Sequence, residues 1–498
     1  MTTPDPNADT PVAGSMPALA DGSQSQRSVV NASEVVDASL PQNWSRTRRW
    51  SIVVVLSLMS LMVSMSLVIN TPAATTIADE FDEHDGFLSV FFITVPNLGQ
   101  IISPLYIGPL SERFGRAPVC HVFNILFIIF TMAGGFSSGF GPIIACRFLA
   151  GACIFSIPLN PAITGDLFAK HERGTAMSLA SMIPILGSAV GPIVGGYVTQ
   201  YLDWRWTFWL MASFTACLTP LMAVALKESY VPVIQRRRLK KEGRSSQRTS
   251  PPSPPKYWKG WNMASVKAIL LLAVRPFVIL GSSCVAVLMT LYLALLFGYV
   301  SILASTLATI FQETYSFSES QSGLVYISLT VGTLTGVVLC TFTLDYFFVH
   351  GLFGKRREHG ASPRPENRLI PAIPAMVAFP AGLFIYGWCL ESHVHWAVPA
   401  IGALLCGFSL SSSTTPIMNF VVDIFGDRAA SAVAAVLPLR YVAGAFLPIA
   451  SPYMYDRLGY GWGNSLLAFV LLSIVPFIFW IIVQPRRKAV AQTAVTST

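Results

Sequence analysis

A short charged turn, GPLSERFGR at residues 108–116, combines residue types that are unusual for a connecting loop. It lies between two apolar runs that are each long enough to cross a lipid bilayer, so it must reverse the chain at one membrane face. A solvated connector that obeys the positive-inside bias would explain Arg113 and Arg116 but would leave the glycine spacing unexplained. The turn is therefore a candidate functional element, and the helices around it must position its charges.

The composition predicts those helices. The chain has 498 residues, of which 53% are hydrophobic and 12% charged, and its mean hydropathy is +0.57. In soluble domains about a quarter of all residues are charged. Apolar runs of about 20 residues recur along the chain, so we expect an all-α membrane protein with twelve transmembrane helices in two six-helix bundles. The predicted spans are 50–72, 86–107, 119–138, 142–165, 175–200, 206–226, 278–311, 319–346, 370–390, 396–422, 429–455 and 463–483.

The distribution of charge predicts the orientation. Nearly all of the 33 Lys and Arg residues fall on the side of the membrane that holds both termini, whereas the other side holds Arg205 and Arg457. By the positive-inside rule both termini are cytoplasmic. We expect the plasma membrane, with the vacuolar membrane as the alternative. The formal charge of +8 is explained by this bias, so no nucleic-acid partner is expected.

Segments outside the spans divide the chain. We expect a disordered cytoplasmic tail at 1–49, an N-terminal bundle at 50–226, a cytoplasmic linker at 227–269, a C-terminal bundle at 270–483 and a cytoplasmic tail at 484–498. The basic and Ser/Pro-rich linker splits the spans six and six, as expected of a parallel repeat. No nucleophile constellation, metal-ligand set or phosphate loop is recognisable, so neither an enzyme nor a metal or cofactor site is predicted.

Polar residues within the spans are candidates for a transport pathway, because such residues generally face protein or water. Hydrogen bonding between packed helices is an equally good explanation for several of them. Arg147 lies inside span 4, and Arg440 is the deepest formal charge in the chain. The aromatic residues suit an adaptable pocket for an amphipathic compound. The candidates for coupling or for a substrate cavity are Asn97, Gln100, Arg147, Asn160, Tyr292, Tyr299, Glu313, Tyr326 and Arg440.

Span 5 contains the glycine-rich sequence GSAVGPIVGG. Glycines four residues apart form a flat helix face that another helix can approach closely, and the proline removes one backbone hydrogen bond. Tight packing alone would explain the glycines but would not require the Gly-Pro pair. The residues concerned are Gly187, Gly191, Pro192, Gly195 and Gly196.

With these motifs in place, the sequence resembles the major facilitator superfamily and, within it, the twelve-span drug:proton antiporters of fungi. The resemblance covers nearly everything from residue 43 to 480. The turn is similar to the family's G-x-L-a-D-R-x-G-R motif, with Glu112 in place of aspartate, and the span 5 sequence is similar to the antiporter motif G-x-x-x-G-P-x-x-G-G. Arg147 with Gly151 looks like the family's span 4 signature. The turn residues that match or replace motif positions, together with the acidic residue at the end of span 4, are Gly108, Glu112, Arg113, Gly115, Arg116 and Asp166.

The resemblance implies a mechanism. Glu112 would face the start of span 11, and Arg113 or Arg116 would pair with Asp166, so that the halves are held together at the cytoplasmic side in the outward-open state. The Gly-Pro pair of span 5 would shape a tight seal between the halves and accompany export. The energy source would be the proton gradient. The expected partners are a small-molecule substrate, protons and the lipid bilayer, and we expect a monomer.

The substrate and the direction of transport stay open at this stage. Two buried arginines would also suit an organic anion. Besides proton-driven export of drugs or secondary metabolites, the alternatives are uptake or facilitated diffusion of a nutrient and, in a different class, a transporter-like sensor.

Overall fold

The computed structural model describes residues 41–83, 85–168, 170–241, 277–278, 280–350, 365–425 and 429–483. Residues 1–40 of the tail predicted at 1–49, the tail predicted at 484–498, and residues 242–276 in and after the predicted linker lie outside the described residues. The described part is helical throughout and contains no strand, which confirms the predicted all-α class.

Helices of the first half follow the predicted spans closely. They are α2 (Arg46–Val68), α3 (Ala74–Glu80), α4 (Gly86–Phe114), α5 (Arg116–Gly135), α6 (Phe140–Ala152), α7 (Ser156–Leu167), α8 (Lys170–Tyr201), α9 (Arg205–Ala225) and α10 (Val231–Lys241). The first span begins four residues earlier than predicted, because Ser45 caps α2 and its hydroxyl accepts a hydrogen bond from the amide of Arg48 at 3.4 Å. Helix α10 lies where only a linker was expected.

The second half consists of α12 (Cys284–Tyr315), α13 (Glu319–His350), α14 (Ala372–Glu391), α15 (Ala397–Phe425), α16 (Ala429–Phe446) and α17 (Ser451–Val483). Short 3-10 turns lie at Pro41–Asn43, Pro365–Leu369 and Pro448–Ala450.

Ten segments of the described chain are long and apolar enough to cross a membrane. Two features reconcile this with twelve predicted spans. The fourth span is divided into α6 and α7 by a break at residues 153–155, and the last segment, Ala435–Trp480, turns at Gly459, whose φ is 70°. Glycine adopts that backbone conformation without a steric penalty. The turn falls between the predicted spans 11 and 12.

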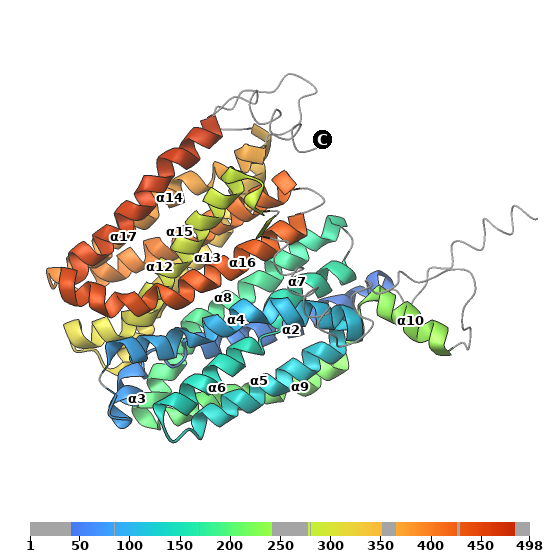
Figure 1. Ribbon diagram of the computed structural model, residues 1–498, viewed down its shortest axis with the longest axis horizontal. Helices are drawn as coiled ribbons and strands as arrows, with labels where there is room; N and C mark the ends of the chain where they lie inside the picture. The colour runs from blue at the N-terminus through green and yellow to red at the C-terminus, as the bar shows by residue number, and fades with distance from the viewer. Residues whose placement is uncertain are drawn as a thin grey trace, which may run out of the picture.

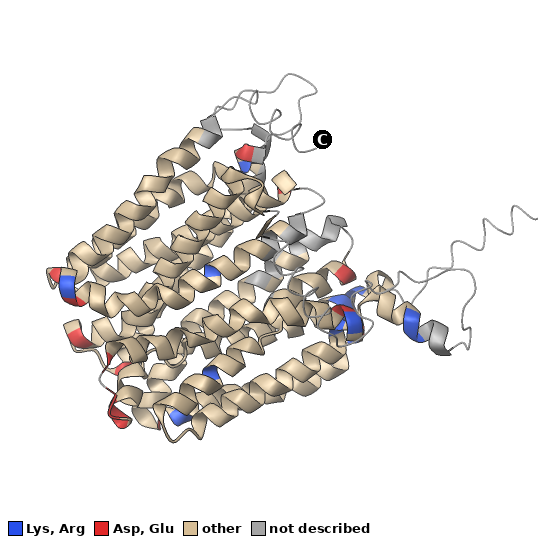
Figure 2. Cartoon of the chain, viewed as in Figure 1, with Lys and Arg blue, Asp and Glu red and all other residues tan. Residues whose placement is uncertain are grey.

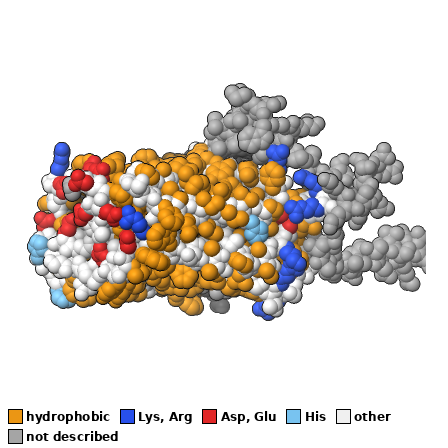
Figure 3. Space-filling model, turned by 90° about the horizontal axis from the view of Figure 1, so that it is seen from below, with side chains coloured by type: hydrophobic (Ala, Val, Ile, Leu, Met, Phe, Trp, Pro, Cys, Tyr) orange, Lys and Arg blue, Asp and Glu red, His pale blue; other side chains and the backbone are white. Residues whose placement is uncertain are grey.

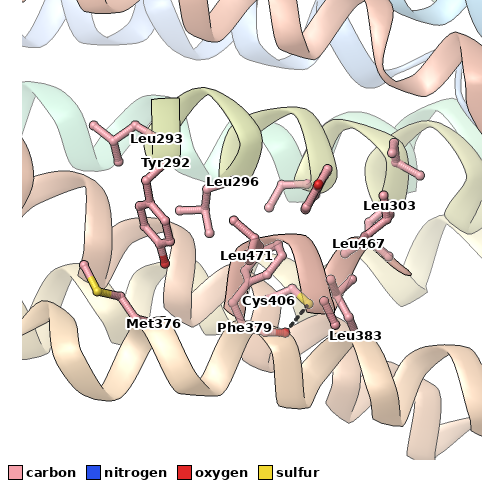
Figure 4. Packing of buried hydrophobic residues seen from close by; sticks show 14 of the residues in the cluster. Tyr292, Leu293, Leu296, Leu303, Met376, Phe379, Leu383, Cys406, Leu467 and Leu471 are labelled. Atoms are coloured by element: carbon pink, nitrogen blue, oxygen red, sulfur yellow. Dashed lines mark hydrogen bonds between the residues drawn. The ribbon is translucent and has the colours of Figure 1, made fainter. Parts of the chain in front are cut away.

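Each half has its own hydrophobic core. One buried cluster consists of residues between 52 and 226, and another of residues between 280 and 478. Figure 1 shows the two groups of helices as neighbouring layers, α2–α9 on one side and α12–α17 on the other. In the second core, Tyr292 and Leu296 of α12 face Met376 and Phe379 of α14, beside Leu471 of α17 (Figure 4).

The bundle has two chemically distinct ends. Charged residues gather at both ends of the helices and are sparse between them (Figure 2), where hydrophobic side chains cover most of the face seen in Figure 3. We use "acidic end" for the end with α3 and the α8–α9, α12–α13 and α14–α15 connections. We use "basic end" for the end with the α4–α5 turn, α10 and the 3-10 turn at Pro365–Leu369.

Candidate functional site

The charged turn at the basic end is a break of one residue between two helices. Helix α4 ends at Phe114 and α5 begins at Arg116, with Gly115 between them at φ 107°. A side chain at position 115 would be strained by this backbone conformation. It would also meet a carboxylate, because a β-carbon there would lie 2.6 Å from Cδ of Glu228. The glycine is therefore required by the turn itself.

Arg116 makes the predicted pair with Asp166. Its Nε lies 3.4 Å from Oδ2 of Asp166 at the end of α7, and one terminal nitrogen donates to Oγ of Ser111 at 2.7 Å. The guanidinium also stacks over the ring of Tyr230, 5.0 Å from its centroid. Arg116 is 8% exposed, so the charge is held by its partners rather than by water. This network joins helices of the first half to one another.

Glu228 completes the network, and sequence reasoning missed it. Its Oε1 accepts a hydrogen bond from the backbone amide of Arg116 at 2.8 Å, at the first residue of α5, and Oε2 lies 4.0 Å from Arg237 of α10. A carboxylate at a helix N-terminus is stabilised by the free amides and the helix dipole. The signal in the sequence was an acidic residue directly after a span in an otherwise basic loop.

The predicted contact between Glu112 and the start of span 11 lies outside the described side chains, because those of residues 429–431, 433 and 434 are not described. Glu112 is exposed, and Arg113 stacks over the ring of Phe114 at 5.2 Å. A β-carbon at Gly108 would meet nothing within 4 Å. The hydrogen bonds that Thr75, Thr76, Asn97, Gln312 and Ser320 make between the two halves all lie toward the acidic end.

The span 5 motif packs on two helices at once. A β-carbon at Gly187 would lie 2.7 Å from the carbonyl oxygen of Leu61, and one at Gly191 would lie 3.0 Å from that of Met65. Gly195 continues this face and approaches the backbone of Ile69. These three glycines thus form the flat surface on which α2 lies.

The other face of the motif meets the second half. A β-carbon at Gly196 would lie 2.8 Å from the carbonyl carbon of Glu319, and one at Gly323 would lie 3.0 Å from the carbonyl carbon of Pro192. One turn further along α8, Gln200 accepts a hydrogen bond from the amide of Ser320 at 3.2 Å. We call this contact of α8 with the start of α13 the seam. It brings the two backbones together where the halves meet at the acidic end.

Helix α3 crosses the same end and was not predicted as a functional element. The hydroxyl of Thr76 donates to Glu319, and Thr75 donates to Oε1 of Gln312 at 3.5 Å. Gln312 in turn donates to the carbonyl oxygen of Pro72 at 3.1 Å and to Oγ of Ser322 at 3.0 Å. Two polar side chains of the second half thus hold the loop and helix that follow α2.

An ion pair fixes α3 to the first half. Nη2 of Arg205 lies 2.7 Å from Oε1 of Glu80, and the indole N–H of Trp204 donates to the other carboxylate oxygen. The hydrogen bond from Arg205 lowers the pKa of the Glu80 carboxyl below its ordinary value. Arg205, the isolated positive charge on the acidic side of the first half, is therefore explained by a structural pair.

The polar residues of spans 2 and 4 have different roles. Asn97 donates from Nδ2 to the carbonyl oxygen of Gly444 at 3.2 Å and so connects α4 to α16 across the halves, while Gln100 donates to Oδ1 of Asn97 at 3.3 Å. Asn160 instead donates to Oγ of Ser60 at 2.6 Å, which is packing within the first half. Asn97 and Asn160 thus both hydrogen-bond to a packed neighbouring helix, but Asn97 does so across the two halves.

The two deep arginines, one in each half, both contact neutral groups. Arg147 of α6 donates to the carbonyl oxygens of Leu67 at 3.1 Å and Ile93 at 3.4 Å. Arg440 of α16 lies over the ring of Phe297, 4.7 Å from its centroid. No carboxylate pairs with either arginine among the described residues.

The tyrosines predicted to line a cavity require a correction. Tyr292, Tyr299 and Tyr326 are at most 3% exposed and belong to the packed core of the second half. The hydroxyl of Tyr326 donates to the carbonyl oxygen of Ala304 at 2.6 Å, which binds α13 to α12. Their long apolar rings fill space between helices, an alternative that residue type alone could not exclude. Glu313 is exposed at the acidic end of α12.

The sequence also matches a known protein family. The sequence profile described as Major Facilitator Superfamily matches residues 56–448. The chain belongs to the Major Facilitator Superfamily. The protein is thus a membrane transporter and not an enzyme.

Two curated relatives of this chain come from fungi. The chain is 36% identical to "Efflux pump radE" of Floropilus chiversii, over 89% of this chain and 82% of that protein. It is 34% identical to "MFS-type transporter penM" of Penicillium rubens, over 89% and 86% of the two chains. Among solved structures, a partially occluded inward-open conformation of the xylose transporter XylE from E. coli matches with a TM-score of 0.65 at 17% identity, over 89% and 99% of the chains. At that identity the likeness concerns the fold.

Proposed function

We propose that this transporter exports drugs, toxins or secondary metabolites by alternating access, with protons moving in the opposite direction. The observation that carries the proposal is the seam, in which the Gly-Pro motif of α8 packs against α2 and α13 together. In this arrangement the two halves are held together at one end by close backbone contact and can separate at the other end. Alternating access requires such an arrangement. The printed name of one relative, an efflux pump, supports the direction.

The orientation follows from charge. With the basic end in the cytoplasm and both termini there, the seam closes the outer side, and the turn at residues 108–116 lies at the inner side. In the proposed orientation, this conformation would face inward and receive substrate from the cytoplasm. When the basic end closes, α16 would approach the network of Arg116, Asp166 and Glu228. The exposed Glu112 lies beside this network. The plasma membrane is the membrane that such an exporter would serve.

Proton coupling is supported by one carboxylate at the seam. Glu319 lies at the start of α13, accepts a hydrogen bond from Thr76 and contacts the backbone at Gly196. Protonation would change that hydrogen bond and the charge at the contact between the halves. A proton moving down about 100 mV and one pH unit releases roughly 3.7 kcal/mol, which sustains a substrate gradient of several hundredfold.

Cellular accumulation tests this proposal. Cells lacking the gene, cells with it restored and cells with the Gly196→Val variant would be loaded with a panel of fluorescent drugs, organic acids and the host's own metabolites, with and without a protonophore. Export predicts higher retention in the deletion and Gly196→Val cells, and protonophore should raise retention in the restored cells to the same level. Gly141→Ala is the matched control, because a β-carbon at position 141 meets nothing within 4 Å. Lower uptake in the deletion strain would show import instead.

A further inference from the structure

A small cavity of about 20 Å³ lies inside the first half, among α2, α4, α5, α6 and α9. Its polar lining comes from Ser66, Thr131, Cys146 and Arg147, and most of the remainder is apolar, including Phe127 and Phe208. A volume of this kind holds roughly one guest the size of a water molecule. The cavity is distinct from the seam and from the charged turn.

Arg147 brings a positive charge to this cavity that its contacts do not neutralise. The side chain is 4% exposed, and its guanidinium donates to two backbone carbonyl oxygens and lies over the ring of Phe92, 4.6 Å from the centroid. Carbonyl oxygens and an aromatic face are neutral partners. No carboxylate forms an ion pair with it among the described residues. An uncompensated charge that is buried costs several kcal/mol.

Two buried polar atoms of the lining lack a partner. Nε of Arg147 and Oγ1 of Thr131 have no hydrogen-bond partner, and Thr131 is also 4% exposed. A helical threonine usually donates to the carbonyl four residues earlier, as Thr215 does to Met211 at 2.8 Å. Thr131 does not. Two side chains from different helices, α5 and α6, therefore offer one N–H and one O–H donor to the same small space.

We propose that this cavity binds a small monovalent inorganic anion, with chloride as the physiological ligand. A chloride ion accepts hydrogen bonds from both donors and neutralises the guanidinium, which a water molecule cannot do. The apolar lining suits a weakly hydrated halide, and the volume excludes sulfate and phosphate. The bound anion would fix Arg147 at the carbonyl of Leu67, near the end of α2 where the chain turns toward α3. This proposal does not depend on the direction of transport or on proton coupling.

Thermal unfolding of the purified protein in detergent tests the site. The melting temperature would be measured while sodium gluconate is replaced by sodium chloride or sodium bromide at constant ionic strength. A ligand that binds the folded state raises the melting temperature with its concentration until the site saturates. We expect a saturable rise with chloride and with bromide. Equal melting temperatures in chloride and gluconate would overturn the proposal.

Two variants test whether the rise in melting temperature with chloride comes from this cavity. Thr131→Val keeps the shape and removes the hydroxyl, and should raise the apparent dissociation constant for chloride about tenfold. Thr219→Val is the matched control: it removes a hydroxyl in the same half that accepts a hydrogen bond from Asn124 at 2.7 Å, so it should lower the melting temperature but preserve the chloride increment. An unchanged chloride dependence in Thr131→Val would place the anion elsewhere. Anomalous scattering from bromide-grown crystals should show a peak between Arg147 and Thr131, and a water molecule alone at that position would refute the site.

Discussion

Gly196 of α8 lies directly against the backbone of Glu319 at the start of α13, so that a β-carbon at position 196 would be 2.8 Å from the Glu319 carbonyl carbon. These two residues belong to different halves of the protein. Two backbones can approach so closely only where a side chain is missing. Close approach of the two helices at the acidic end therefore requires a glycine at position 196.

Replacing that glycine should weaken closure. Gly196→Val would push the end of α8 and the start of α13 apart and shift the protein toward the conformation that is open at the acidic end. Accessibility of a cysteine introduced at Ser322 to a membrane-impermeant reagent should rise severalfold, because Ser322 is fully buried beside Gln312 where the two halves meet. Gly141→Ala in the same cysteine background serves as the control. Unchanged accessibility in Gly196→Val would show that the seam does not govern closure.

A substitution in the turn at the basic end should, unlike Gly196→Val, create no overlap in this conformation. A β-carbon at Gly108 meets nothing within 4 Å in this conformation. We expect Gly108→Ala to leave the melting temperature almost unchanged, because the change creates no overlap here, but to reduce transport if α16 approaches this surface when the basic end closes. A large loss of thermal stability would contradict the open space seen at this residue, and normal transport would contradict the approach of α16.

The ion pair between Arg116 and Asp166 should contribute measurably to stability. Both side chains are largely buried, at 10% and 24% exposure. Removing one partner leaves the other without its hydrogen bond, so Arg116→Gln should cost about 1–3 kcal/mol in the free energy of unfolding. A double-mutant cycle with Asp166→Asn separates the pair from its surroundings. Strictly additive effects would mean that the two residues do not interact, and the exposed Arg236 offers a neutral control as Arg236→Gln.

The ion pair of Glu80 with Arg205 predicts a pH dependence. The pKa of Glu80 is lowered in the folded protein, so the pair contributes its full stability above the ordinary carboxyl pKa of 4.5 and loses it as the pH falls through the lowered value. Glu80→Gln should therefore lower the melting temperature between about pH 5 and 8. The difference from the parent protein should shrink below about pH 4.5. A difference that grows on acidification would contradict the assignment.

Much of the fold followed from the sequence because a membrane imposes strong rules. Span length, charge asymmetry and the glycine at 115 are set by bilayer thickness, by the positive-inside bias and by backbone conformation, which act locally. The pairing of Arg116 with Asp166 came from family resemblance.

The contacts between halves could not be predicted in this way. Which glycines of α8 face α2 and which face α13 depends on helix rotation, and Gln312 looks like any polar residue at a helix end until α3 lies beside it. Tyr292 shows that residue type alone also fails to predict a residue's surroundings. An aromatic residue suits a binding pocket or a packed core equally well, and only its surroundings decide between them.

Directional flux in inside-out membrane vesicles tests the central proposal most directly, with the compounds that the cellular assay identifies as retained. The vesicle lumen corresponds to the outside of the cell. Acidifying the lumen should drive these compounds into the vesicles, protonophore should abolish the accumulation, and Gly196→Val vesicles should show little of it. Accumulation that is indifferent to the pH gradient, or flux out of the lumen on acidification, would contradict proton-driven export.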